Sequence, residues 1–248
     1  MNVPTWTSLT LGGRAVPLLR VGERSVGDGA LAVALAAGGL APGRWPVLVL
    51  VGGASGVSDQ ERARWQGLFR DGLVAGVAAG GGCVLDGGTD TGVMALVGAA
   101  REAFGAGFPL IGVVARGTIR WPGRAPRRPD AAALEPHHTH LVAVPGGEWG
   151  MESPWLARLA TVLAAGAPTV TVVVNGGTIT LEDVRHSLAA ARRVLAIART
   201  GRAADELVAA SRGEPSGAPA SPLVTVVDAL EHPTALATAV ADALKLLS

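Results

Sequence analysis

Glycine-rich segments carrying hydroxyl or carboxylate side chains follow five of the apolar runs in this 248-residue chain. Glycine lets a backbone approach phosphate oxygens closely, and a helix that begins just after such a segment presents free N–H groups to an anion. These residue types and spacings therefore point to a phosphorylated ligand. The candidate binding residues are Gly52, Gly53, Ala54, Ser55, Gly87, Gly88, Thr89, Thr91, Gly92, Gly146, Gly147, Glu148, Trp149, Asn175, Gly176, Gly177, Thr178, Gly201 and Arg202.

Several other side chains allow two interpretations. Glu152 stands where a helix is expected to begin, so its carboxylate either complements the helix dipole or acts as a catalytic or ribose-binding group. Trp149 either packs within its loop or stacks on a base. His138 and His140 fall on one face of an expected strand, and without a neighbouring cysteine or carboxylate at ligand spacing we expect packing or hydrogen bonding and no metal. The basic run at 116–128 is expected to be a solvated, irregular loop.

The elements that must position these residues alternate between short β-branched runs and stretches of helical period. This alternation predicts one α/β domain over residues 1–248, a Rossmann-like fold whose mostly parallel sheet carries helices on both faces. Residues 1–40 are expected to pack on it as an extension with one strand and one helix. The predicted strands span 47–51, 83–85, 110–115, 141–144, 169–174, 194–198 and 223–227, and the predicted helices 59–79, 92–104, 152–165, 181–190, 203–210 and 234–247. Ser58 with Glu61 predicts a capping box at the start of the first of these helices, and Thr180 with Asp183 could open another in the same way.

A parallel sheet brings the glycine loops together. All its strands point the same way, so the loops meet at one edge, where open α/β sheets bind ligands. Any single Gly-Gly could simply make a tight turn, but five such loops at one edge are harder to explain in that way. Neither the G-x-G-x-x-G spacing nor a P-loop with its lysine is present, which disfavours hydride transfer on NAD and P-loop ATP hydrolysis.

Composition narrows the class of protein further. The apolar runs are short and cut by Gly-Gly, and none reaches the roughly 20 residues that a membrane-spanning helix needs. Residues 1–13 show no secretory signal, and the single cysteine, Cys83, excludes an internal disulfide, which fits a cytoplasmic protein. A net charge of +1 does not favour nucleic acid or an anionic membrane as partner.

The same segments resemble a known superfamily, SLOG, and most closely the SLOG (LSDAT) domain of TRPM ion channels and its stand-alone prokaryotic relatives. The resemblance rests on GGTDTGVM at 87–94 and on GEWGME at 147–152. It also rests on TGRAAD at 200–205, on HTH at 138–140, and on Gly52-Gly53-Ala54 ahead of a helix containing FRDGL at 69–73.

This resemblance implies a Rossmann-like sensor for nucleotides related to ADP-ribose. In the channels a threonine of the first glycine loop, an aromatic residue of the fourth-strand loop and the arginine of G-R-x-A-D contact the ligand. The aromatic residue and the arginine carry over as Trp149 and Arg202. The channels also use an arginine shortly after the aromatic residue, but here that stretch reads ESPWL at 152–156, a departure that puts identical ligand geometry in doubt.

A more distant resemblance is to the LOG-type phosphoribohydrolases, which cleave an N-glycosidic bond in nucleoside monophosphates. Their P-G-G-x-G-T-x-x-E motif is approximated by PGGEWGME at 145–152, which places Glu152 near the catalytic register. Their catalytic arginine has no counterpart in LEPHH at 134–138, and this departure favours binding over hydrolysis.

We therefore expect a cytoplasmic sensor whose partner is a small-molecule nucleotide, with no cofactor required beyond that ADP-ribose-like ligand and with no nucleic-acid or membrane partner. The alternative is an N-glycosidic hydrolase in which Glu152 is catalytic. A structural module without ligand is the third hypothesis, and a homodimer is left open.

Overall fold

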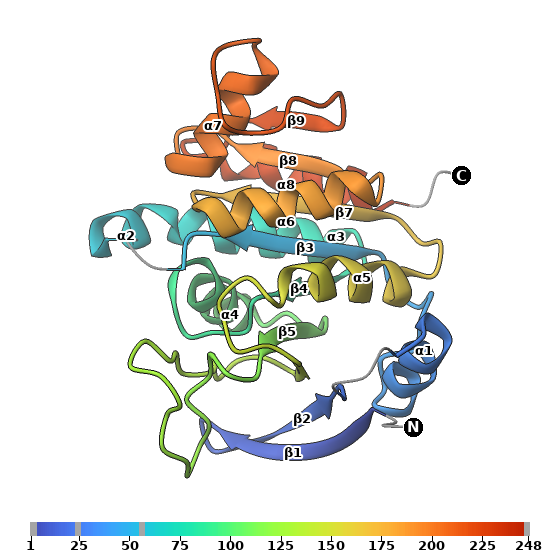
Figure 1. The fold of residues 1–248 in the computed structure, drawn as a ribbon. Helices are drawn as coiled ribbons and strands as arrows, with labels where there is room; N and C mark the ends of the chain where they lie inside the picture. The colour runs from blue at the N-terminus through green and yellow to red at the C-terminus, as the bar shows by residue number, and fades with distance from the viewer. Residues whose placement is uncertain (1–3, 23–25, 55–57, 246–248) are drawn as a thin grey trace.

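A nine-stranded sheet forms the centre of the computed structural model, which describes residues 4–22, 26–54 and 58–245 (Figure 1). The strand order is β1-β2-β6-β5-β4-β3-β7-β8-β9; β1 is antiparallel to β2, and every other neighbouring pair is parallel. The predicted α/β class with a mostly parallel sheet is confirmed. The strands are β1 (Thr5–Leu11), β2 (Arg14–Arg20), β3 (Val47–Gly52), β4 (Cys83–Asp86), β5 (Leu110–Ala115), β6 (His140–Val144), β7 (Thr169–Val174), β8 (Arg193–Ile197) and β9 (Val224–Val227).

Helices cover both faces of the sheet, so the central strands are buried and mostly apolar. One hydrophobic core lies under α1 (Asp28–Ala37), α5 (Ser153–Ala164), α6 (Thr178–Ala189) and α7 (Arg202–Ser211). The other lies under the continuous run α2 (Asp59–Gly67), η1 (Leu68–Val74) and α3 (Ala75–Ala79), together with α4 (Gly92–Phe104) and α8 (Pro233–Leu244). None of these helices is long and apolar enough to cross a membrane, within the part of the chain that the structure describes.

The order of the strands creates a crevice at β3. From β3 the chain proceeds to β4, β5 and β6 on one side, and then returns to β7, β8 and β9 on the other side. The connection after β3 therefore leads toward one edge of the sheet, and the connection after β7 leads toward the other edge. A cleft forms between these two connections at the carboxyl ends of the strands.

The first forty residues differ from the expectation of one strand and one helix. They form a hairpin of two strands followed by α1, and β2 extends the sheet by pairing in parallel with β6. Gly12 and Gly13 both have positive φ angles, 53° and 78°, the backbone that a two-residue hairpin turn requires. The mostly exposed β1 has no continuous apolar run, which is why the sequence pattern missed it.

The long predicted helix at 59–79 is continuous, but its middle third, η1, is a π-helix. Its start follows the predicted capping box: the Ser58 hydroxyl accepts the Glu61 N–H at 3.2 Å, and the Ser58 N–H donates to the Glu61 carboxylate at 2.8 Å.

Candidate functional site

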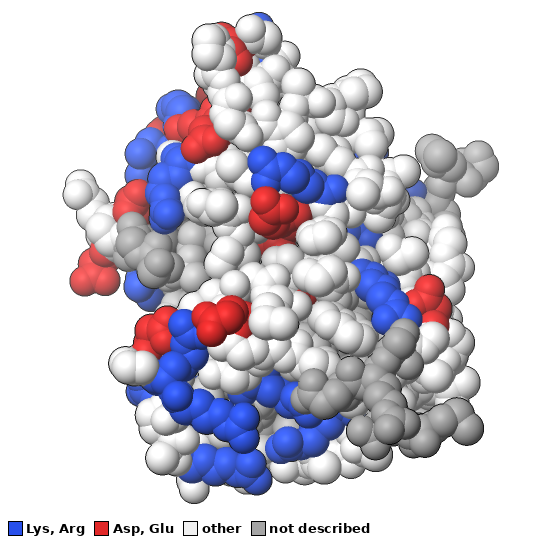
Figure 2. Space-filling view, viewed as in Figure 1, with Lys and Arg blue, Asp and Glu red and all other residues white. Residues whose placement is uncertain are grey.

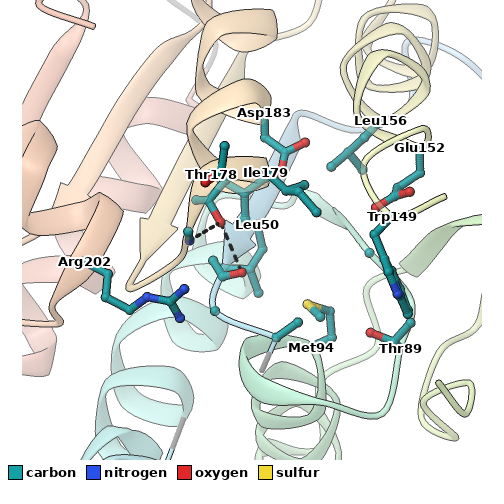
Figure 3. Close-up of a pocket in the computed structure, with 17 residues that line it drawn as sticks. Leu50, Thr89, Met94, Trp149, Glu152, Leu156, Thr178, Ile179, Asp183 and Arg202 are labelled. Atoms are coloured by element: carbon teal, nitrogen blue, oxygen red, sulfur yellow. Dashed lines mark hydrogen bonds between the residues drawn. The ribbon is translucent and has the colours of Figure 1, made fainter. Parts of the chain in front are cut away.

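A cavity of about 330 Å³ lies at the carboxyl ends of β3, β4 and β7 (Figure 3). Its wall is made by the loops that follow these strands, the segment after β6 and the first turns of α6 and α7. Many of the residues singled out from the sequence meet here. Those in the wall are Gly52, Gly53, Ala54, Gly87, Thr89, Trp149, Glu152, Gly177, Thr178 and Arg202.

The other candidates lie elsewhere. Gly146, Gly147 and Glu148 line a second hollow. Ser55 falls outside the described residues. The remaining candidates are absent from the cavity wall: Gly88, Thr91, Gly92, Asn175, Gly176 and Gly201.

Two of these candidates illustrate a structural role behind the wall. Gly92 has a φ of 49°, and a Cβ placed on it would lie 1.8 Å from the Gly53 carbonyl oxygen, so only glycine lets α4 begin against the first loop. The buried Asn175 donates its side-chain N–H to the Thr200 carbonyl at 2.6 Å, and its backbone N–H to the Thr200 hydroxyl at 2.9 Å. These residues fix the loops that carry the wall.

Arg202 enters the cavity from the first position of α7. A Cβ placed on Gly177 would lie 2.7 Å from Nη2 of Arg202, so the guanidinium lies against the start of α6. The backbone of Arg202 has a φ of 54°, a left-handed conformation that costs a residue other than glycine about 1–2 kcal/mol. Asp205 holds this loop by accepting the N–H groups of Arg199 at 2.8 Å and Gly201 at 3.1 Å. Strain retained at a cavity wall is a feature of functional sites.

Helix α6 begins three residues earlier than predicted, at Thr178, and the predicted start signal from Thr180 and Asp183 is wrong. Thr180 instead accepts the Gly177 N–H and donates its hydroxyl to the Gly52 carbonyl, both at 3.3 Å, and joins two loops of the wall (Figure 3). This shift leaves Asp183 one helical turn inside α6, where it lines the cavity.

Two carboxyl groups, those of Glu152 and Asp183, therefore belong to the same cavity (Figure 3). Burial raises the pKa of Glu152, although the carboxylate accepts the Gly150 N–H at 3.1 Å. Burial raises the pKa of Asp183 to about 7, the hydroxyl of Ser153 opposes this shift, and the negative charge of Glu152 adds to it. With a pKa of about 7, Asp183 is present in both its protonated and its ionised form near neutral pH, so its carboxyl group can donate or accept a hydrogen bond. Sequence reasoning missed Asp183 because it assigned that carboxylate to a helix cap.

Trp149 lines the opposite side of the cavity from Arg202 (Figure 3). Its indole N–H donates to Asp130 Oδ2 at 3.0 Å, which ties the ring to the segment between β5 and β6. The half-buried ring contributes an apolar surface to the cavity.

The second glycine loop is supported by a buried charged network. His138 lies with Nε2 2.7 Å from Asp86 Oδ1 and Nδ1 2.7 Å from Glu135 Oε2. Burial alone would lower the pKa of His138, but the charge of Asp86 and the hydrogen bonds with both carboxylates outweigh it and raise the pKa to about 10. Asp86 Oδ1 also accepts the Gly88 N–H at 2.7 Å, and the Glu135 N–H donates to the Gly88 carbonyl at 3.1 Å. The imidazolium therefore helps fix the loop that carries Thr89.

The expectation that His138 and His140 lie on one face of a strand is wrong, because β6 begins only at His140. His140 Nε2 lies 3.2 Å from the Gly38 carbonyl oxygen, and its ring does not contact the carboxylates that bind His138. Among the residues that the structure describes, no group of three or more His, Cys, Asp or Glu side chains is arranged to hold a metal ion.

The fold and this cavity are those of a Rossmann-like ligand-binding module. Residues 45–238 match the family model described as SLOG in TRPM, prokaryote. The chain belongs to this family, as the glycine loops and the 200–205 motif predicted.

Two solved structures share the fold at low sequence identity. The molybdenum cofactor carrier protein from Chlamydomonas reinhardtii is 18% identical, with a TM-score of 0.52, over 81% of this chain and 99% of that chain. The molybdenum cofactor binding protein from Rippkaea orientalis is 15% identical, with a TM-score of 0.50, over 79% of this chain and 98% of that chain. Comparison with curated proteins gave no match.

Proposed function

We propose that the cavity binds a nucleotide related to ADP-ribose and that the protein acts as a sensor of this ligand. The observation that carries the proposal is the placement of Arg202 against the N-terminal turn of α6, with the Trp149 ring across the same cavity (Figure 3). A guanidinium beside a helix N-terminus favours phosphate, and an aromatic ring favours a base. Membership of the SLOG family supports a ligand-binding role.

The wall suits the three parts of a nucleotide. Arg202 and the N–H groups of Thr178 and Ile179 in the first turn of α6 bind a phosphate, because N–H donors and positive charge are concentrated there. Trp149 packs on the base. Glu152 and Asp183 bind the ribose hydroxyls, one as acceptor and the other as donor. This hypothesis also includes a cytoplasmic location and no nucleic-acid partner, and it leaves open whether the protein forms a homodimer.

The direct test is calorimetry and thermal unfolding of the purified protein with ADP-ribose, cyclic ADP-ribose, NAD and AMP. We expect at least one of them to bind stoichiometrically and to raise the melting temperature, because a ligand that binds only the folded state stabilises it. Molybdenum cofactor belongs in the same panel because two proteins of this fold are named for it. Binding of that cofactor with no response to any nucleotide would overturn the proposal.

One observation supports hydrolysis as a second candidate. The paired carboxyl groups of Glu152 and Asp183 are the kind of acid and base that glycosidic cleavage uses. Hydrolysis also needs positive charge to hold the phosphate and its leaving group. The arginines of the 116–128 segment that could assist line the second hollow, and Arg202 is the one arginine among the described residues lining this cavity.

We expect no release of free base above background when the protein is incubated with nucleoside monophosphates or ADP-ribose. Chromatography of the reaction mixture measures this, with the Glu152→Gln variant as control because it keeps the shape of the side chain and removes its charge. Multiple-turnover base release that disappears in Glu152→Gln would establish the hydrolase instead.

A further inference from the structure

A second hollow, of about 950 Å³, shares the segment 145–152 with the nucleotide cavity as part of its wall. The rest of its wall comes from the end of β2 and from the segment between β5 and β6. Figure 2 shows basic side chains gathered over this lower part of the molecule. The arginines that line the hollow are Arg20, Arg116, Arg124, Arg127 and Arg128.

Positive charge predominates in this hollow. Among the described residues that line it, two carry carboxylates, Asp130 and Glu148, and both pair with Arg128, at 2.5 Å and 2.9 Å. Arg124 and Arg127 are exposed, and among the described residues no ion pair joins either of them to a carboxylate. The chain as a whole has a net charge of only +1, so this concentration of arginine is local.

The segment that carries these arginines is irregular, as predicted, but hydrogen bonds fix its path. The Trp121 indole N–H donates to the Arg116 carbonyl at 3.0 Å, and the Arg120 N–H donates to the Ala132 carbonyl at 2.8 Å. Arg128 donates to the Gly147 carbonyl at 2.7 Å, which joins the segment to the loop after β6. The arginines are thus held near one another despite their mutual repulsion, whereas a simple solvated loop would let them separate.

We propose that this hollow is a second binding site, for a small molecule that carries two or more adjacent phosphate groups. Guanidinium groups form paired, charge-assisted hydrogen bonds with phosphate oxygens, and several of them can bind several phosphates together. The volume lies within the range of about 300–1,000 Å³ that small-ligand sites occupy. The bound anion replaces repulsion among the arginines with attraction.

A small polyphosphate fits this hollow better than single-stranded nucleic acid. A single-stranded nucleic acid binds by stacking its successive bases on aromatic side chains of the protein. Among the described residues that line the hollow, Trp121 is the single aromatic one. The Arg20 guanidinium already covers its ring, with the guanidinium carbon 5.6 Å from the ring centre. The wall therefore offers charge without a row of stacking surfaces.

The test is calorimetric titration of the full chain with inorganic tripolyphosphate at 0.15 M salt. We expect saturable binding that weakens about 10-fold or more in the Arg124→Ala/Arg127→Ala double variant, since each lost charge-assisted hydrogen bond lowers affinity. The matched control is Arg193→Ala/Arg212→Ala, which removes the same charge from two exposed arginines outside the hollow and should leave affinity within about 2-fold. Thermal unfolding of each variant confirms that it folds.

Four results would overturn this second site, the last of them in the Arg202→Ala variant. One is the absence of tripolyphosphate binding, and another is equal weakening in both double variants, which would indicate a general charge effect. The third is tighter binding of a single-stranded RNA with affinity that rises with its length, which would indicate a nucleic-acid surface. The Arg202→Ala variant separates the two cavities: tripolyphosphate binding should persist in it, and loss there would place the anion in the nucleotide cavity instead.

Discussion

Replacing His138 by glutamine is expected to destabilise the protein by about 3–5 kcal/mol, the cost of removing one partner from a buried charged network. His138 is fully buried and bridges Asp86 and Glu135, whose side chains are also buried. A glutamine amide can donate to one carboxylate, but it brings no positive charge to either. Two carboxylates would then remain in the interior without a cation between them.

The matched control is His140→Gln. This histidine lies two residues further along the chain, is only half-buried, and has its pKa lowered by burial, so it contributes no buried positive charge. Its replacement should cost about 1 kcal/mol or less, the value of an ordinary hydrogen bond. Urea unfolding of the three proteins measures the difference, and equal losses in the two variants would contradict the assignment of a charged network to His138.

The same network makes a prediction about pH. The pKa of His138 is about 10 in the folded protein and 6.5 in an ordinary environment, so its stabilising contribution is complete below pH 6.5. It declines as the pH rises toward 10, because the unfolded chain has by then already released this proton. Unfolding free energies at pH 6, 7.5 and 9 should therefore fall in the wild type and change less in His138→Gln. A steep decline that is equal in both proteins would assign it to other groups.

Replacing Arg202 by alanine is expected to weaken nucleotide binding by about 1.5–3 kcal/mol, the range for charge-assisted hydrogen bonds, while the fold stays intact. The guanidinium lies at the N-terminal turn of α6 inside the cavity, and alanine reaches no phosphate there. Calorimetry with the nucleotide that binds best to the wild type measures the loss. Unchanged affinity would remove Arg202 from the binding site.

The strained backbone of Arg202 supplies an independent readout. Arg202→Gly should lose the same affinity as Arg202→Ala but be more stable than it by about 1 kcal/mol, because glycine adopts a positive φ without steric cost. Arg199→Ala is the matched control for binding. Arg199 also has a positive φ, 64°, but its guanidinium pairs with Asp228 and does not line the cavity, so its replacement should leave affinity unchanged.

The sequence by itself determined the class of fold and the region of the candidate site. The runs that became β3 and β5 are apolar at nearly every position because helices cover both faces of the sheet, and this pattern needs no knowledge of the partners. The glycine loops that follow the parallel strands had to meet at one edge because these strands all point the same way. The motifs at 87–94 and 200–205 determined the family.

Only the tertiary structure decided which of these residues face the ligand cavity. Gly53 lines it, whereas Gly92 lies behind it, where α4 begins against the first loop. Asp183 entered the cavity because α6 begins at Thr178, a boundary set by the contact of Thr180 with Gly52.

Contacts between distant parts of the chain decided the remaining features. His138 became a buried cation through Glu135, three positions away, and through Asp86, which is 52 positions away. Four arginines of the 116–128 segment came to line one hollow because Arg128 and Trp121 hold that segment in place; they are Arg116, Arg124, Arg127 and Arg128. Charges and hydrogen bonds act through space between residues far apart in the chain, so local patterns of hydrophobicity and glycine spacing could not reveal these partners.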